Sequence, residues 1–191
     1  MTVLEITGAL ISLLYLRLEY KANIWLWVVG VITPVIYIYL FFVSKFYADM
    51  GINIYYLFAS AYGVYCWKKK GAGESIFRIT RLPLRLVWKL FAIFSGLFAL
   101  IAWILICFTD SPVPYGDALT TALSVVAMWM LAQKYAEQWL LWIVVNVVSA
   151  GLYLWRDLYP TGILFVIYAV VSAFGYLKWR KMAMGHADDA D

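Results

Sequence analysis

The segment Trp139–Asn146 reads W-L-L-W-I-V-V-N and combines the composition of a membrane helix with two indoles and one primary amide. At about 100° per residue, its two tryptophans and its asparagine fall on one face of a helix, which Ser149 and Tyr153 continue. A primary amide is costly in hydrocarbon unless a partner hydrogen-bonds it, so we expect this face to meet protein, water or a ligand. The stripe predicts a binding site for a small, flat, polar molecule.

The composition of the chain predicts an integral membrane protein. Of its 191 residues, 65% are hydrophobic and 14% are charged, and the mean hydropathy is +0.83. A soluble domain is roughly half apolar and about a quarter charged. Glu5, Arg17 and Glu19 interrupt the first apolar run. We therefore expect this run to remain as a helix rather than to be a cleaved signal peptide.

Apolar runs along the chain predict an all-α fold with seven transmembrane helices. About 20 residues are needed to cross about 30 Å of hydrocarbon. Five uncharged runs approach this length, at 24–43, 50–67, 90–108, 138–155 and 158–177, and two weaker runs cover 6–20 and 118–133. Seven spans place the two ends of the chain on opposite sides of the membrane.

The distribution of basic residues predicts the orientation in the bilayer. Seven of the 15 Lys and Arg residues lie between positions 68 and 89, so the positive-inside rule makes this connection cytoplasmic. Alternation of the spans then leaves only Lys45 and Arg156 outside. We expect a multi-pass protein of the bacterial inner membrane, with its N-terminus outside and its C-terminus inside. Orientation alone explains these cations, so nucleic acid is not an expected partner.

The two halves of the sequence repeat with an offset of 112 residues. Between positions 27 and 69 this shift gives ten identities in 43 positions, among them those at Trp27, Ser60, Gly63 and Trp67; roughly three or four are expected by chance. The run at 90–108 has no counterpart, so it is expected to join two parallel three-helix units in a 3+1+3 plan. The expected parts are a first unit at 1–67, a basic linker at 68–89, the connecting helix at 90–108, a second unit at 109–181 and a disordered tail at 182–191.

Aromatic and amide side chains on the repeated stripes are the candidate substrate-binding residues. They are Trp27, Tyr37, Asn53, Tyr56, Trp139, Trp142, Asn146 and Tyr168. Pro34, Gly63 and Gly175 are candidate gating residues, because a proline halfway along a span permits a kink. Glycines on a helix face are more often packing contacts, and tryptophans at span ends more often form an interfacial belt. Trp142 lies a turn deeper than Trp139 and is the better stacking candidate.

Other functional classes fit the sequence less well. An enzyme would need a nucleophile with its base, or metal ligands, yet no H-E-x-x-H motif occurs and no carboxylate interrupts the five long runs. The only histidine, His186, lies in the C-terminal tail, so we expect no metal site and no cofactor. A retinal photoreceptor needs a lysine in its last span, and 158–177 has none. A membrane sensor or accessory subunit stays open as an alternative to a transporter.

Three stretches of the chain together resemble one transporter family. They are Asn23-Ile24-Trp25 through to Tyr37, then Tyr47-Ala48-Asp49 leading to Ser60-Ala61-Tyr62-Gly63 and Trp67, and finally W-x-x-W-x-x-x-N at Trp139, Trp142 and Asn146. In these features, over nearly its whole length, the chain resembles the Pnu vitamin transporters. The resemblance implies a SWEET-like 3+1+3 fold and a homo-oligomer such as a trimer. It also implies a B-vitamin moving down its gradient, without ion coupling, to be trapped by a cytoplasmic kinase.

The resemblance extends to the choice of substrate. Nicotinamide riboside members often have asparagine where this chain has Pro34, and they lack the ending of the first helix at 16–21, so thiamine is the expected substrate and nicotinamide riboside the alternative. Both are cationic heteroaromatics, which suit a site of Trp, Tyr and Asn with a nearby carboxylate. Glu19 and Asp49 are the available acids. For Glu19, an ion pair with Arg17 or Lys21 at the inner surface is the favoured interpretation.

Overall fold

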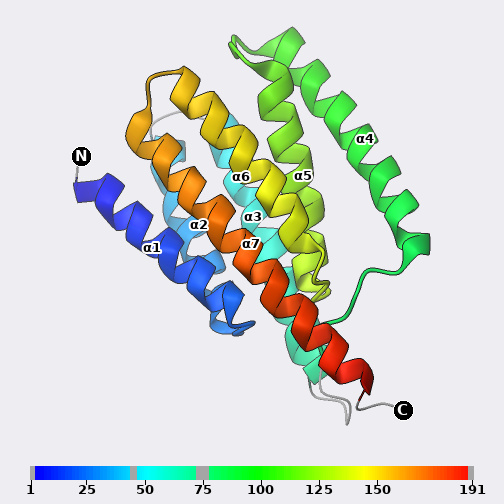
Figure 1. Ribbon diagram of the computed structural model, residues 1–191. Coiled ribbons are helices and arrows are strands. Elements are labelled where there is room, and N and C mark those ends of the chain that lie inside the picture. Colours follow the sequence, from blue (N-terminus) through cyan, green and yellow to red (C-terminus); the bar gives the residue numbers. More distant parts are fainter. Residues whose placement is uncertain (1–2, 44–46, 72–77, 189–191) are drawn as a thin grey trace. The chain divides into compact units, whose positions relative to one another are not determined.

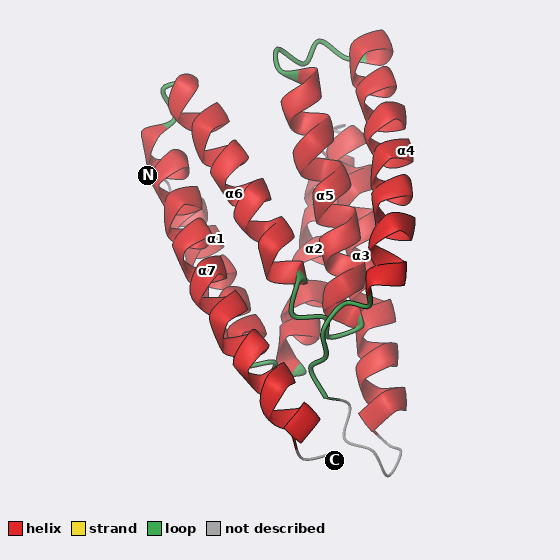
Figure 2. Cartoon of the chain, turned by 45° about the vertical axis from the view of Figure 1, so that its right-hand side comes forward, coloured by secondary structure: helices red, strands yellow, loops and turns green. Residues whose placement is uncertain are grey.

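The computed structural model describes residues 3–43, 47–71 and 78–188, and these ranges are almost entirely helical (Figure 1). The seven helices in the described ranges are α1 (Val3–Tyr20), α2 (Trp25–Val43), α3 (Tyr47–Gly71), α4 (Leu84–Phe108), α5 (Pro114–Ala132), α6 (Gln138–Trp155) and α7 (Tyr159–Asp188). In the described part of the chain, loops and turns connect α1 to α2, α4 to α5, α5 to α6 and α6 to α7 (Figure 2). The predicted all-α fold class is confirmed.

The helix bounds agree best with the predicted spans where charged residues flank the apolar run on both sides. α6 begins at Gln138 and ends at Trp155, as expected. α3 and α7 run past their predicted ends, to Gly71 and Asp188. Residues 182–188, which we expected to belong to a disordered tail, are therefore helical, and the rest of that tail lies outside the described residues.

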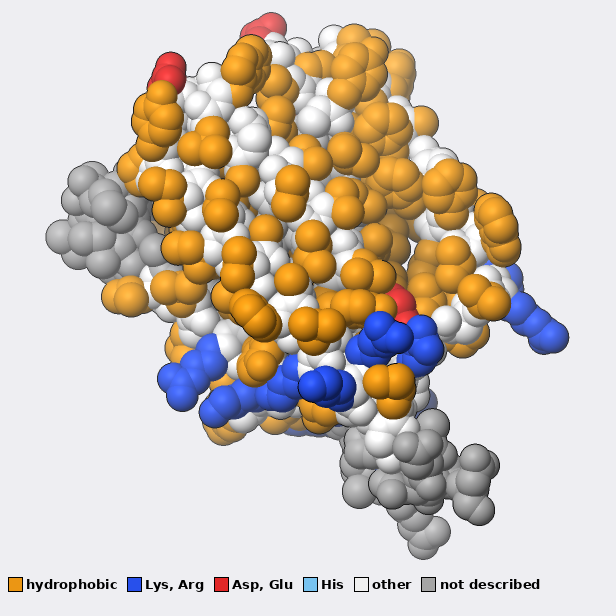
Figure 3. Space-filling view, in the orientation of Figure 1, with side chains coloured by type: hydrophobic (Ala, Val, Ile, Leu, Met, Phe, Trp, Pro, Cys, Tyr) orange, Lys and Arg blue, Asp and Glu red, His pale blue; other side chains and the backbone are white. Residues whose placement is uncertain are grey.

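Four of the described helices are long and apolar enough to cross a membrane. They are Leu84–Phe108, Pro114–Ala132, Gln138–Trp155 and Tyr159–Gly185, and Trp25–Tyr39 is a shorter apolar helix. Much of their apolar surface points outward: Leu84 in α4 is 84% exposed and Phe108 is 70% exposed. Hydrophobic side chains also cover most of the face drawn in Figure 3. Such surface suits a lipid environment rather than water.

The chain divides into two compact units, at Met1–Phe77 and Arg78–Asp191. In the first unit α2 packs along α3, and α1 contacts α2. In the second unit α6 packs along α7, and α5 contacts both α4 and α6. The predicted connecting helix thus packs on α5 and belongs to the second unit. The six residues before its predicted start at position 90 are also helical, because α4 begins at Leu84.

Candidate substrate-binding site

A tryptophan and a glycine hold α2 against α3 in the first unit. The Trp27 side chain is completely buried, and its ring meets Trp67 edge-to-face with 5.6 Å between ring centroids. A Cβ atom added to Gly63 would lie 2.5 Å from the Trp27 ring. Only a glycine allows the two helices to approach this closely, so packing explains the presence of Gly63.

The second unit repeats this arrangement between α6 and α7. Trp139 is completely buried and meets Trp179 edge-to-face at 5.8 Å, and a Cβ on Gly175 would lie 2.7 Å from the Trp139 ring. These three residues correspond to those of the first unit under the 112-residue offset. Trp27 and Trp139 are thus enclosed by protein in this structure, and they offer no exposed ring face on which a ligand could stack.

Replacement of Gly175 by alanine is expected to destabilise the protein. The added methyl group would overlap the Trp139 ring, and overpacking of this kind costs typically about 1–3 kcal/mol. Thermal unfolding of the purified protein in detergent measures the effect. Gly151→Ala is the matched control in α6, because a Cβ there meets nothing within 4 Å. Equal unfolding temperatures for the two variants would contradict the packing role of Gly175.

The Asn146 amide lies at the centre of the second unit's polar stripe. Its side chain is 6% exposed, and its Nδ2 donates a hydrogen bond to Ser172 Oγ at 3.2 Å. Ser172 Oγ in turn donates to the backbone oxygen of Tyr168 at 2.7 Å. A primary amide has two N–H donors and an oxygen acceptor, so the remaining N–H and the oxygen can serve a ligand.

Trp142 lies one helical turn before Asn146 on the same face of α6. Its side chain is partly buried, and its Nε1 is buried with no hydrogen-bond partner among the described residues. Nε1 of Trp27 and of Trp139 is also without such a partner, but helix packing encloses those two rings. A buried indole N–H usually finds a partner, because leaving it unpaired costs about 1–3 kcal/mol. Trp142 therefore has both a ring surface and a donor for a bound molecule.

Further aromatic rings extend the stripe toward the α6–α7 loop. Tyr153 and Phe165 stack at 5.2 Å with an interplanar angle of 15°, and Phe165 meets Tyr168 edge-to-face at 5.8 Å. Tyr153 comes from α6, and the other two come from α7. The rings and the amide together line one polar, aromatic strip along this helix pair.

The first unit places its candidate residues less specifically. Tyr37, Asn53 and Tyr56 are partly buried, and the Tyr56 ring lies 5.6 Å from that of Tyr55. Pro34 is buried, and α2 continues through it as one helix. Its function as a hinge remains a prediction. The side chain of Asp49 and that of His186 lie outside the described part of the chain.

The structure buries one acidic side chain that we expected at the surface. Glu19 is only 2% exposed, whereas Arg17 and Lys21 on either side of it are exposed. The expected surface location of Glu19, beside Arg17 or Lys21, is therefore wrong. Burial here depends on how α1 packs in its unit, which a local charge pattern does not reveal.

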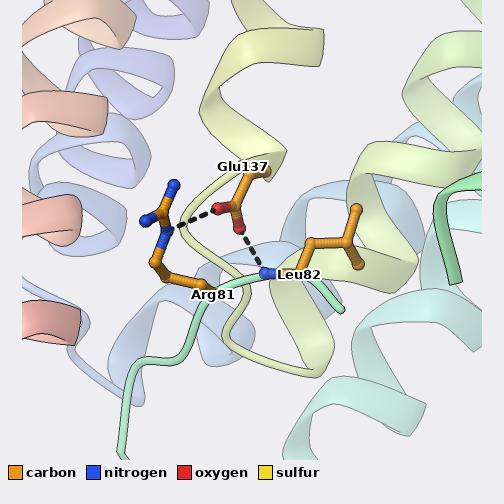
Figure 4. A network of polar contacts seen from close by, with 3 residues as sticks. All are labelled: Arg81, Leu82 and Glu137. Atoms are coloured by element: carbon orange, nitrogen blue, oxygen red, sulfur yellow. Dashed lines mark hydrogen bonds and ion pairs between the residues drawn. The ribbon is translucent and has the colours of Figure 1, made fainter. Parts of the chain in front are cut away.

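A polar contact that the sequence does not predict joins the basic linker to the α5–α6 loop. Glu137 accepts a hydrogen bond from the backbone N–H of Leu82 at 2.7 Å, and it pairs with Arg81 Nε at 3.5 Å (Figure 4). Thr80 also forms a β-bridge with Tyr135. The contact places the linker and the start of α6 at the same end of the second unit, as alternation of the predicted spans requires. No local sequence signal marks a pairing between residues 55 positions apart.

Comparison with known proteins assigns the family. The model of the family described as "Nicotinamide mononucleotide transporter" matches residues 2–181. The chain belongs to this family. The predicted membership in the Pnu transporters is therefore confirmed, and the protein is a multi-pass membrane transporter.

Individual members of the nicotinamide mononucleotide transporter family are similar over most of their length. The nicotinamide riboside transporter PnuC of Escherichia coli (strain K12) is 25% identical over 205 residues, covering 94% of this chain and 86% of the relative. The protein of the same name from Neisseria mucosa is 29% identical, covering 87% and 68%. A crystal structure of the vitamin B3 transporter PnuC matches with a TM-score of 0.72 and 26% identity, covering 93% of this chain and 80% of the other. These names do not support the expected thiamine branch.

Proposed function

We propose that this protein carries nicotinamide riboside into the cell, in place of the thiamine expected from the sequence. The observation that carries the proposal is the Asn146 amide beside the Trp142 ring on one half-buried face of α6. The matched relatives, whose names specify nicotinamide riboside, support it independently. The features that favour thiamine, Pro34 and the ending of the first helix, both lie in the first unit.

The chemistry of nicotinamide riboside fits this face. Its pyridinium ring is a flat cation, which suits the electron-rich face of Trp142. Its carboxamide offers one acceptor and two donors, and the free N–H and oxygen of Asn146 complement these groups. The unpaired Nε1 of Trp142 supplies a further donor. Tyr168 and the neighbouring rings would line the path beside this position.

The unphosphorylated riboside suits the chain better than the mononucleotide after which the family is named. A phosphate group needs Arg or Lys partners, particularly where water is excluded. The predicted spans 24–43, 50–67, 90–108, 138–155 and 158–177 contain neither residue type. By the same reasoning, thiamine pyrophosphate is not a substrate.

The proposed mode of transport is facilitated diffusion across the bacterial inner membrane. The five long predicted spans contain no carboxylate or histidine that would couple movement to a proton or a sodium ion. A cytoplasmic kinase would then trap the product.

We also propose the seven-span 3+1+3 plan, with the N-terminus outside, and a homo-oligomeric state. The matching Trp–Gly contacts in the two units support the repeat.

Uptake and binding experiments test the proposal. Liposomes containing the purified protein should equilibrate labelled nicotinamide riboside without an ion gradient and should not concentrate it. Thermal stabilisation by nicotinamide riboside, thiamine, riboflavin and thymidine ranks the substrates, since a ligand at about 100 times its dissociation constant adds roughly 2.7 kcal/mol. Stronger stabilisation by thiamine would overturn the substrate assignment. Binding without uptake would instead indicate a sensor or accessory subunit.

A further inference from the structure

The first unit contains a buried carboxylate to which the proposed function assigns no role. Glu19 lies one residue before the end of α1 and is 2% exposed. Removing a carboxylate from water costs several kcal/mol unless other groups compensate for it. Ionisable side chains enclosed in membrane helices are rare for this reason, and they commonly mark a substrate or ion site.

Phenol rings accompany this carboxylate. Tyr15 lies one turn earlier on the same face of α1, and both Glu19 and Tyr56 interact electrostatically with its hydroxyl group. The Tyr15 ring also lies against α2, because a Cβ on Gly30 would be 3.4 Å from its Cε2 atom. Residues from α1 and α3 thus gather acidic and phenolic groups beside a glycine of α2.

The position that corresponds to Glu19 in the second unit holds an uncharged residue. Under the 112-residue offset Glu19 corresponds to Leu131, and Tyr15 corresponds to Ala127. Both of these residues are completely buried in α5. A buried leucine therefore stands at the corresponding position of the sequence repeat, which argues that helix packing alone does not require a carboxylate at Glu19.

The pair of positions occupied by Tyr15 and Gly30 in the first unit also contains one aromatic residue in the second unit, but on the other helix of the pair. In the first unit Tyr15 lies against Gly30, whereas the residue corresponding to Gly30 in the second unit is Trp142. The residue that corresponds to Tyr15 is the small Ala127. The units therefore keep an aromatic group but differ in polar chemistry, with an acid in the first and an amide in the second.

We propose that Glu19, together with Tyr15 and Tyr56, forms a cation-selecting site in the first unit. A carboxylate beside the Tyr15 phenol, with Tyr56 next to that phenol, attracts an aromatic cation through its charge and through the ring faces. The ligand class is a positively charged, N-substituted heteroaromatic compound. The inference rests on the proposed function and adds the residue that distinguishes a charged vitamin from a neutral one.

Two substitutions of Glu19 test this site. Glu19→Gln keeps the shape of the side chain, and Glu19→Leu introduces the residue that the second unit has at the equivalent position. Competition binding compares two cations, nicotinamide riboside and thiamine, with two neutral compounds, reduced nicotinamide riboside and riboflavin. Both variants should lose affinity for the bound cation by about tenfold or more, while affinity for neutral compounds changes little.

Controls and alternative outcomes separate the two proposals. Asp110→Asn removes an exposed carboxylate after α4 and should leave the cation preference intact. Folded Glu19 variants with an unchanged preference would overturn the site, as would the failure of both variants to fold, because the proposal requires that packing tolerate the change. Failure of the unaltered protein to bind nicotinamide riboside counts against the proposed function instead, and thiamine then serves as the cationic probe of Glu19.

Discussion

Replacement of Asn146 by leucine is expected to abolish vitamin uptake and to leave the fold largely intact. The amide is 6% exposed and contributes one hydrogen bond to the α6–α7 contact, from Nδ2 to Ser172 Oγ. Leucine has the same number and branching of side-chain heavy atoms, and Ser172 Oγ still donates to the oxygen of Tyr168. No buried donor is left unpaired, so the cost in stability is small. Uptake into proteoliposomes and the unfolding temperature measure the two effects.

A second variant distinguishes substrate binding from helix packing. Ser172→Ala removes the partner of Asn146 and leaves the amide itself in place. If the amide binds the substrate, this variant should retain most of the uptake that Asn146→Leu loses. Equal losses in both variants would assign Asn146 to the α6–α7 contact, and normal uptake by Asn146→Leu would exclude it from the site.

The sequence predicts helices well where apolar runs meet charged residues, and less well where a helix continues into water. α6 is flanked by Glu137 and Arg156, and its predicted bounds are correct. α3 and α7 continue past the apolar run through segments rich in lysine or arginine, which are good helix formers in water. Hydropathy detects the membrane-spanning part of such a helix and not its end.

The environment of an aromatic side chain depends on a neighbouring helix, and a single sequence does not supply that neighbour. Trp139 and Trp142 lie on one stripe, yet Gly175 of α7 covers the first ring, and the second is only partly buried. Glu19 is likewise buried, although the basic residues close to it in the sequence, Arg17 and Lys21, are exposed. Periodicity therefore locates the face that carries the site, and packing decides which members of that face can meet a ligand.

Motifs shared by a whole family do not determine the substrate within it. The W-x-x-W-x-x-x-N pattern predicted the transporter family correctly. The choice of thiamine depended instead on the ending of the first helix at 16–21 and on Pro34, a buried residue in α2 that forms no described polar contact. Substrate choice depends on the hydrogen-bonding groups and charges that reach the ligand. The proposed site of the second unit offers such groups at Asn146 and Trp142, and the site proposed for the first unit offers the Glu19 carboxylate.

Replacement of Trp142 by alanine is expected to weaken substrate binding by about tenfold or more. Stacking and cation–π contacts contribute on the order of 1 kcal/mol each, and they contribute more where water is excluded. The indole also supplies a buried donor without a described partner, on a ring that, unlike that of Trp139, is only partly buried. Trp142→Phe keeps an aromatic face and removes that donor, so it should retain much of the affinity. Competition binding with nicotinamide riboside measures both variants.

The comparison of these two variants separates ring stacking from hydrogen bonding at Trp142. A loss confined to alanine assigns the binding energy to the ring, whereas equal losses assign it to Nε1. Trp155→Ala is the control, because Trp155 is 69% exposed at the end of α6 and lies where an interfacial tryptophan is expected. If the Trp142 and Trp155 variants bind equally well, Trp142 belongs to the same interfacial class and the substrate must contact another part of the stripe.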